Sequence, residues 1–208
     1  MILTPIPRDR LAAALDQFAA QLRDPAARTA FAGIAATAPD RADAEAAERH
    51  RREALAVAGN FGVPIHPEDT VCAFNWDGAA LDGATEAYVI LHEIAHFVLA
   101  PPHRRGLVDF GLGPGPDTRD RAAAEREASL PALDREADEA TASLLGILWE
   151  AALGQPALAS FLDQNWLEGL ERSAAGHFTA VLHDLQQRGL GDVTLPDRGE
   201  CQPSARRR

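Results

Sequence analysis

The chain has little of what marks a secreted or membrane protein. Only two cysteines, Cys72 and Cys201, occur in 208 residues, and their wide separation does not suggest a disulfide framework. No stretch approaches the ~20 uninterrupted apolar residues that a transmembrane helix needs. The N-terminal segment carries a charge by Arg8, unlike a signal peptide. We therefore expect a cytoplasmic protein with free thiols and no membrane partner.

Positive charge is also scarce relative to negative charge. The 20 Lys and Arg residues stand against 31 Asp and Glu residues, which gives a net charge of -11 at pH 7. The negative charge is spread along the chain, whereas a nucleic-acid-binding protein needs a basic surface. We expect no nucleic-acid partner and a protein or small-molecule substrate.

Alanine-rich helical periodicity dominates what is present. We expect helices over residues 8–24, 40–60, 85–99, 120–130, 132–154 and 176–191. Residues 61–76 are instead rich in β-branched and aromatic residues cut by prolines, which predicts a small strand pair.

The predicted fold is mainly α (α+β), with the strand pair beside the helix of residues 85–99. We expect an N-terminal helical segment over 1–60 packed on a catalytic core over 61–195. A disordered tail over 196–208 is expected to follow.

The strongest chemical signal is the run "AYVILHEIAHFVLA". His92 and His96 lie four residues apart, so a helix places both imidazoles on one face, where they can bind one metal ion. Glu93 is rotated by about 100° from His92, which predicts a catalytic residue that acts on what the metal holds. The apolar neighbours predict burial, and buried ionisable groups are costly without a cation. The motif therefore predicts a zincin-like helical metal site.

A third ligand is needed, and a carboxylate commonly completes such a site. The stretch "LDREADEATASLL" offers Asp134, Glu136, Asp138 and Glu139. Helical periodicity favours Glu136, because it lies closest to the apolar stripe of the expected helix. The residues alone leave the choice among the four open.

The stretch "PPHRRGLVDFGLGPGP" follows the motif helix directly. Its length and glycine content are typical of a functional loop, which we expect to fold back over the metal. His103, Arg104, Arg105 and Asp109 are therefore candidates for contact with a substrate or for support of the metal ligands. Asp109 in particular could hydrogen-bond the outer nitrogen of a ligand histidine. An Arg105–Asp109 ion pair that only pins the loop is the structural alternative.

The motif and loop together resemble the elongation factor P hydroxylase family. The resemblance rests on H-E-I-A-H, on the Arg104-Arg105 pair, on "LVDFG" and on the "PD" and "RD" that follow. It covers roughly residues 88–154. It implies a mononuclear non-haem iron site and an enzyme that hydroxylates a modified lysine on elongation factor P.

Carried over by position, the resemblance implies Fe(II) held by His92, His96 and a glutamate. Alignment on Gly154 without gaps selects Glu139, with Glu136 as the alternative. The chain departs from the family in the loop after "DFG", in the "ATA" that follows the glutamate and in its N-terminal 60 residues. We therefore expect a retained metal site with a different substrate.

Two other functions fit the same motif. In a compact zinc peptidase, Glu93 would be the general base, and the pattern in "LDREADEATASLL" would place Asp134 and Asp138 at the metal. Under the hydroxylase interpretation these two aspartates are solvated neighbours. A third possibility is a metal-binding module without catalysis. The loop "RRGLVDFG" favours the hydroxylase, because a minimal peptidase has no need of it.

Overall fold

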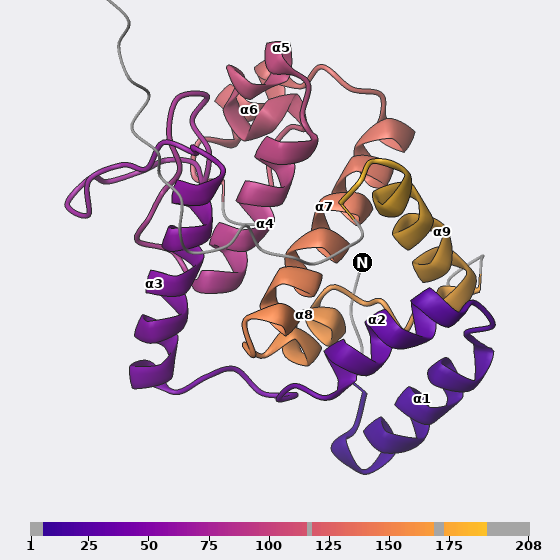
Figure 1. Cartoon of the computed structure of the whole chain (residues 1–208). Coiled ribbons are helices and arrows are strands. Elements are labelled where there is room, and N and C mark those ends of the chain that lie inside the picture. The colour runs from indigo at the N-terminus through magenta and orange to yellow at the C-terminus, as the bar shows by residue number, and fades with distance from the viewer. Residues whose placement is uncertain (1–5, 116–117, 169–172, 191–208) are drawn as a thin grey trace, which may run out of the picture.

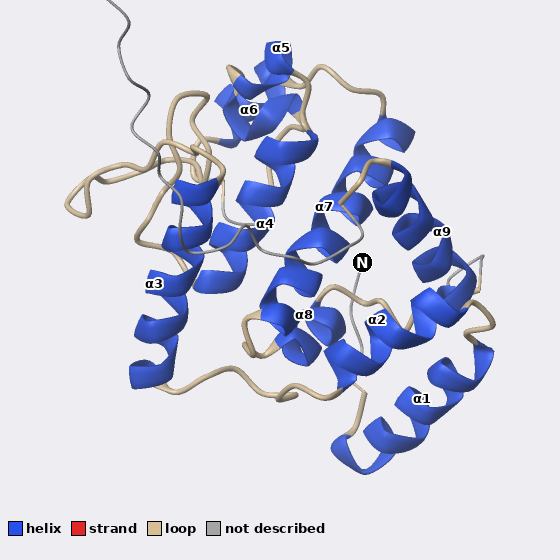
Figure 2. Cartoon of the chain, in the orientation of Figure 1, coloured by secondary structure: helices blue, strands red, loops and turns tan. Residues whose placement is uncertain are grey.

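The computed structural model describes residues 6–115, 118–168 and 173–190 (Figure 1). The prediction of a mainly helical fold is confirmed, since helices joined by loops make up these residues (Figure 2). In chain order the elements are α1 (Arg8–Gln21), α2 (Pro25–Ala35), α3 (Ala44–Asn60), α4 (Ala87–Leu99), α5 (Pro102–Arg105), the 3-10 helix η1 (Val108–Gly111), α6 (Arg121–Glu127), α7 (Ala132–Ala152), α8 (Ala157–Asp163) and α9 (Ala174–Gln187).

The predicted strand pair is wrong. Among the described residues no strand forms, and the loop between α3 and α4 pairs with itself only through isolated bridges, from Ile65 to Leu81 and from Trp76 to Leu81. Pro64 and Pro67 lie on either side of this short contact. Because proline has no N–H, a regular ladder of hydrogen bonds cannot extend in either direction.

Helix α7 is the centre of the fold. Every residue from Thr141 to Glu150 is buried. The helices α2, α4, α8 and α9 pack against α7, and α3 packs against the opposite side of α4 (Figure 1). A helix that is buried on all sides needs apolar or small residues around its whole circumference, which the run "ASLLGILW" provides.

Helix α2, which the periodicity analysis missed, joins the N-terminal residues to this core. Its start signal is present in the sequence, because Asp24 caps the helix and Pro25 occupies its first position. The buried ring of Phe31 contacts Phe161 of α8 and Phe178 of α9, with ring centroids 5.5 and 6.4 Å apart. Aromatic packing thus fixes α2 against two later helices.

The expected tail over 196–208 lies outside the described residues. No helix in the described part of the chain has both the length and the apolar character needed to cross a membrane.

Helices α4 and α7 approach each other closely at Gly146. A Cβ atom added there would lie 3.3 Å from the backbone N and Cα of His92. Normal carbon contacts are about 3.5–4.0 Å, and backbone atoms cannot rotate away as a side chain can. Glycine therefore allows α7 to contact α4 at the first histidine of the motif.

We predict that Gly146→Ala lowers the free energy of unfolding by about 1 kcal/mol, because the added methyl group overpacks the contact with α4. The variant should also bind metal more weakly, since α4 and α7 each supply part of the predicted site. Thermal unfolding and metal titration measure the two effects.

The matched control is Gly33→Ala in α2, where an added Cβ atom meets nothing within 4 Å. This variant should raise the free energy of unfolding by about 0.5–1 kcal/mol, as expected for alanine replacing glycine in a helix. A gain of the same size in Gly146→Ala would show that the α4–α7 contact is not tight.

Candidate metal centre

Helix α4 brings both motif histidines to one place. The helix begins at Ala87 and ends at Leu99, where Pro101 and Pro102 follow and prevent its continuation. The Nε2 atoms of His92 and His96 lie 3.0 Å apart. His96 is buried and His92 is largely buried, so both imidazoles are held by the surrounding protein.

Helix α7 supplies the third group. Glu139 places its Oε2 atom 3.4 Å from Nε2 of His92 and 3.4 Å from Nε2 of His96. Ligand atoms that sit about 2.1 Å from one ion at angles of about 90–109° lie roughly 3.0–3.4 Å apart. The two imidazole nitrogens and the carboxylate oxygen therefore fit a single divalent ion.

The other glutamate candidate points elsewhere. Glu136 is exposed and lines a groove between α7 and α9, together with His177 and Val181. Asp134 is exposed and lines the same groove. Helical periodicity favoured Glu136 by its nearness to the apolar stripe, but the face of α7 that meets α4 in this first half of the helix carries Glu139.

We predict that Glu139→Ala lowers the affinity for iron or zinc by more than about 100-fold, because the change removes a ligand and its charge. Metal titration into the purified variant measures the loss.

Glu136→Ala is the matched control, since it removes the same side chain from the next turn of the same helix. It should bind metal as tightly as the unaltered chain. Loss of binding in Glu136→Ala alone would show that the wrong glutamate has been assigned.

Asp138 lies behind His96. Its Oδ2 atom is 3.8 Å from Nδ1 of His96, a buried nitrogen that has no hydrogen-bond partner within the described residues. The guanidinium of Arg104, itself buried, donates from both terminal nitrogens to Asp138 at 3.2 Å. Ligand histidines commonly donate their outer N–H to a carboxylate, which fixes the ring and its tautomer. Asp138 is placed for this role.

This arrangement bears on two expectations. Arg104 was a candidate for contact with the substrate or for support of the metal ligands, and it is buried and donates to Asp138 behind His96, where the second role would place it. Asp138 was expected either at the metal or in solvent, and it lies at neither place. A buried arginine that forms a two-nitrogen contact fixes a carboxylate in both position and charge.

We predict that Asp138→Asn weakens metal binding by about 10–100-fold, the usual effect of losing a partner of a ligand histidine. The amide keeps the size of the side chain but not the charge that favours the Nδ1 proton. Titration of metal, with circular dichroism to confirm folding, measures the change. Asp134→Asn, on the exposed face of the same helix, is the control. Equal affinities in the two variants would contradict the role of Asp138.

The loop after α4 covers the site with an unusual backbone. Asp109, Phe110 and Gly111 in η1 have positive φ values of 44°, 54° and 72°. Non-glycine residues adopt this region rarely and at a cost, and they concentrate at functional sites. The turn places the buried ring of Phe110 against Trp76 and His96, with ring centroids 5.1 and 5.6 Å away. Phe110 thereby shields His96 from solvent.

The two remaining candidates of the covering loop, Asp109 and Arg105, lie in different surroundings. Asp109 accepts a hydrogen bond from Thr118 at 2.8 Å, and burial raises the pKa of its carboxyl to about 6 although this bond lowers it. Arg105 does not pair with Asp109, since it donates to the Ala100 carbonyl and lies over the ring of Phe97. Asp109 therefore faces the site and Arg105 braces the loop.

His103 is exposed on α5 and is not among the residues that line the metal cavity. Asn75 does line this cavity. It was not predicted from the sequence, because the loop before α4 was expected to form strands. Its amide donates to Oε1 of Glu93 at 3.4 Å.

The three donor groups open into a cavity of about 270 Å³. Its walls come from α4, from α7 and from the covering loop, with Asn75 of the loop before α4 and Gln164 after α8. Among the residues that line it are Glu93, Asp109, Phe110, Leu112 and Gly113. A ligand in this cavity would lie between the three donor groups on one side and the covering loop on the other.

Electrostatics in the centre favour a cation. Burial raises the pKa of the Glu93 carboxyl, although the two histidines lower it. For Glu139 burial acts in the same direction, but His96 and His92 outweigh it and hold the pKa of the carboxyl below its usual range. Burial lowers the pKa of His96, but Glu139 and Asp138 raise it to about 10. A proton and a metal ion compete for the same nitrogen lone pair, so these carboxylates also favour a metal ion there.

No protein-family model matches the chain, and no significant match occurs among curated proteins or solved structures.

Proposed function

We propose that the protein is a metal-dependent oxygenase that hydroxylates its substrate at a site of two histidines and one carboxylate. The observation that carries the proposal is the meeting of His92, His96 and Glu139 at one edge of a cavity of about 270 Å³. Three protein ligands on one side of an ion leave its other positions open, which is typical of non-haem iron oxygenases. Fe(II) is the proposed metal.

The roles of the surrounding residues follow from their positions. Iron bound here would supply the activation of dioxygen for attack on a C–H bond. Glu93, buried beside the ligands, can hold or release a proton at its carboxyl, and Asn75 orients that carboxyl. Phe110 and Leu112 present apolar surface that excludes water from the cavity. Asp109, across the cavity, can accept a hydrogen bond from a polar group of the substrate.

The substrate we propose is a side chain or small molecule that enters the cavity end-on. A modified lysine on elongation factor P, implied by the resemblance, is of this kind. The departures from the family in the covering loop favour a related substrate over the same one, because Gly113 and Gly115 line the cavity where the family carries aromatic residues.

A zinc peptidase is the second candidate. In its favour, Glu93 lines the same cavity as the three ligands, and its raised pKa suits a general base. Against it, an extended peptide commonly binds by adding a strand to an exposed sheet edge, and the described residues offer no strand beside α4. The aspartates of the peptidase pattern, Asp134 and Asp138, are also not among the clustered donor groups.

We predict that protein purified without oxygen and without added metal contains close to one iron per chain. In the presence of dioxygen and a reductant, the iron-loaded protein should consume oxygen when incubated with a peptide or small molecule that carries a modified lysine side chain. It should consume less with elongation factor P itself, because the covering loop departs from that of the family. Mass spectrometry of the substrate should show the gain of one oxygen atom.

Glu93→Gln serves as the matched variant. It should keep its iron, because Glu93 is not among the clustered donors, and lose most of its turnover because the amide cannot exchange a proton. The oxygenase proposal would be wrong, and the peptidase proposal favoured, if the purified protein contained zinc and cleaved an unfolded protein. Glu93→Gln should then abolish that cleavage.

A further inference from the structure

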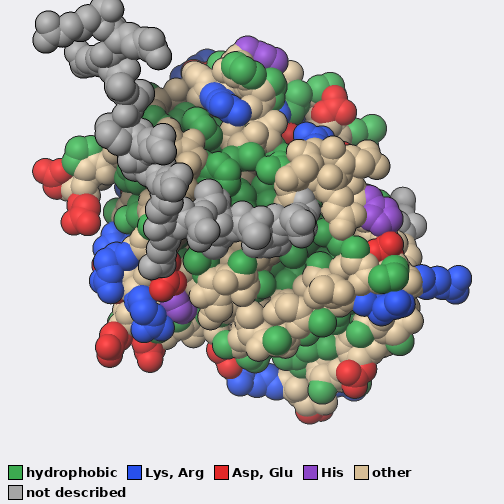
Figure 3. Space-filling model, in the orientation of Figure 1, with side chains coloured by type: hydrophobic (Ala, Val, Ile, Leu, Met, Phe, Trp, Pro, Cys, Tyr) green, Lys and Arg blue, Asp and Glu red, His purple; other side chains and the backbone are tan. Residues whose placement is uncertain are grey.

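Fixed polar contacts for a ligand lie inside the molecule rather than on the face drawn in Figure 3. On that face, acidic and basic side chains lie near one another along the margins, and hydrophobic side chains lie between them. Neighbouring charges of opposite sign partly cancel, so this face favours neither an anionic nor a cationic ligand. The metal cavity, in contrast, holds polar groups in fixed positions.

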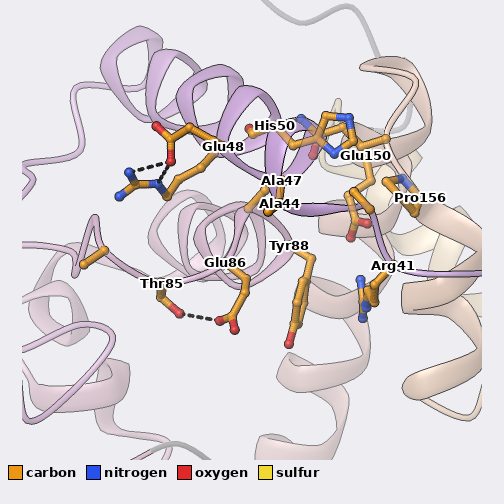
Figure 4. Close-up of a pocket in the computed structure, with 15 residues that line it drawn as sticks. Arg41, Ala44, Ala47, Glu48, His50, Thr85, Glu86, Tyr88, Glu150 and Pro156 are labelled. Carbon is orange, nitrogen blue, oxygen red and sulfur yellow. Dashed lines mark hydrogen bonds and ion pairs between the residues drawn. The ribbon is translucent and has the colours of Figure 1, made fainter.

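The metal cavity is bounded by a fixed wall at the start of α4. Tyr88 lines this cavity and also a larger one of about 450 Å³ between α3 and α4. The guanidinium of Arg41 lies 3.7 Å from the centre of the Tyr88 ring (Figure 4), and it donates to Ser160 at 2.8 Å and to Asp163 at 2.6 Å. Because α8 holds Arg41 in this way, Arg41 and Tyr88 together separate the two cavities. The polar groups that can recognise a ligand of the metal centre are therefore those of the metal cavity itself.

Thr118, which follows the covering loop, is one of these groups. Its side chain is buried, and its hydroxyl forms two hydrogen bonds. The backbone N–H of Gly115 donates to this hydroxyl at 2.8 Å, and the hydroxyl donates to Oδ2 of Asp109 at 2.8 Å. A backbone N–H can only donate, and a hydroxyl has a single hydrogen. Gly115 therefore uses a lone pair of Thr118 and leaves the hydroxyl hydrogen for Asp109.

The backbone of Asp109 is fixed as well. Its φ of 44° is in the left-handed region, and its N–H donates to the carbonyl of Trp76 at 3.0 Å. Two residues further on, the carbonyl of Gly111 accepts a hydrogen bond from the N–H of Ser129 at 2.8 Å. A non-glycine residue keeps a left-handed conformation only where its surroundings over-determine it, and such residues gather at functional sites. Asp109 is thus held both by its backbone and by one carboxyl oxygen.

The other carboxyl oxygen of Asp109, Oδ1, is open. Within the described residues the carboxyl accepts its hydrogen bond at Oδ2 alone. In the same part of the chain, the buried side-chain nitrogen and oxygen atoms without a partner are the Nδ1 atoms of His92 and His96. Oδ1 is therefore accessible, and Asp109 lines the metal cavity. Thr118 occupies one oxygen of the carboxyl and leaves the other for a ligand.

We infer that Thr118 is a positioning residue of the metal cavity, which holds the Asp109 carboxyl so that Oδ1 accepts a hydrogen bond from an N–H or O–H group of the substrate. The substrate would then carry such a donor group on the side that faces the covering loop. The contact with a substrate rests on the function proposed for the metal centre, whereas the action of Thr118 on Asp109 is measurable without it.

The first test compares the titration of Asp109 in the full chain with its titration in Thr118→Val, which keeps the shape of the side chain but lacks the hydroxyl. The carbon-13 signal of the Asp109 carboxyl, identified by its loss in Asp109→Asn, reports the pKa. A hydrogen bond donated to a carboxylate lowers the pKa of that carboxyl. Thr118→Val should therefore raise the pKa of Asp109 by about 0.5–1. Glu93, His96 and Glu139 also act on this carboxyl through their charges, and they are the same in every variant.

Thr118→Ser restores the hydroxyl and should return the pKa of Asp109 to its value in the unaltered chain. Thr141→Val is the matched control, because it removes a buried hydroxyl that donates to the Ala137 carbonyl within α7 at 2.8 Å. It should leave the titration of Asp109 unchanged, and circular dichroism checks the folding of each variant. An unchanged pKa of Asp109 in Thr118→Val, or an equal rise in Thr141→Val, would overturn the inference.

The second test separates this inference from the proposed function. With a substrate that the iron-loaded protein hydroxylates, Thr118→Val should raise KM by about fivefold and leave kcat within about twofold, because Asp109 holds the substrate and not the metal. Thr118→Ser should recover the original KM. An unchanged KM in Thr118→Val would show that Asp109 does not contact the substrate. If the unaltered chain hydroxylates nothing, the oxygenase proposal is wrong, and the titration alone decides whether Thr118 positions Asp109.

Discussion

The contact between α4 and α7 is the constraint on which the rest of the structure depends. Two of the three clustered donor groups come from α4 and the third from α7, so the donors converge only if the helices stay in register and close together. Gly146 permits that approach beside the backbone of His92. The other helices hold this pair in place, because α2, α8 and α9 pack against α7 and α3 packs against α4. The geometry of the donor cluster is therefore a property of helix packing.

The sequence predicted what is local and missed what depends on packing. His92 and His96 share one helix, so their convergence follows from helical periodicity alone. The position of Glu139 does not follow in the same way. The apolar stripe describes the buried second half of α7, whereas Glu139 lies in the partly exposed first half. There the direction in which α4 crosses α7 decides which carboxylate meets the histidines. Glu136, one turn away, matched the apolar periodicity of the whole helix, but at the point where the two helices cross it does not face α4.

The residues that surround His96 could not be predicted either, because they come from distant parts of the chain. Arg104 and Asp138 are 34 residues apart, and nothing in their local sequence indicates that they pair. Phe110 reaches His96 only because Asp109 and Phe110 adopt left-handed backbone conformations, which local propensity disfavours. The predicted strand pair was wrong for the opposite reason, because local sequence indicated a structure that does not form. The β-branched residues favoured strands, but the prolines lack the N–H groups that a ladder of hydrogen bonds requires. Strained or long-range features of this kind usually mark sites where function competes with local preference.

The charges around His92 and His96 are not balanced by the protein alone. Glu93, Asp109, Asp138 and Glu139 surround the two imidazoles, whereas Arg104 is the only guanidinium in contact with this group of described residues. Of these four side chains Glu93 is buried, Asp109 and Asp138 are partly buried, and Glu139 is half exposed. Carboxylates crowded in this way repel one another and favour a proton or a cation between them. Burial raises the pKa of Glu93 and of Asp109, so the charged forms of these two carboxyl groups are disfavoured, while the histidines lower the pKa of Glu139. A divalent ion between His92, His96 and Glu139 would neutralise the remainder. The same carboxyl groups that repel one another thus favour a metal ion between the three donors, and the raised pKa of Glu93 suits a group that exchanges a proton beside them.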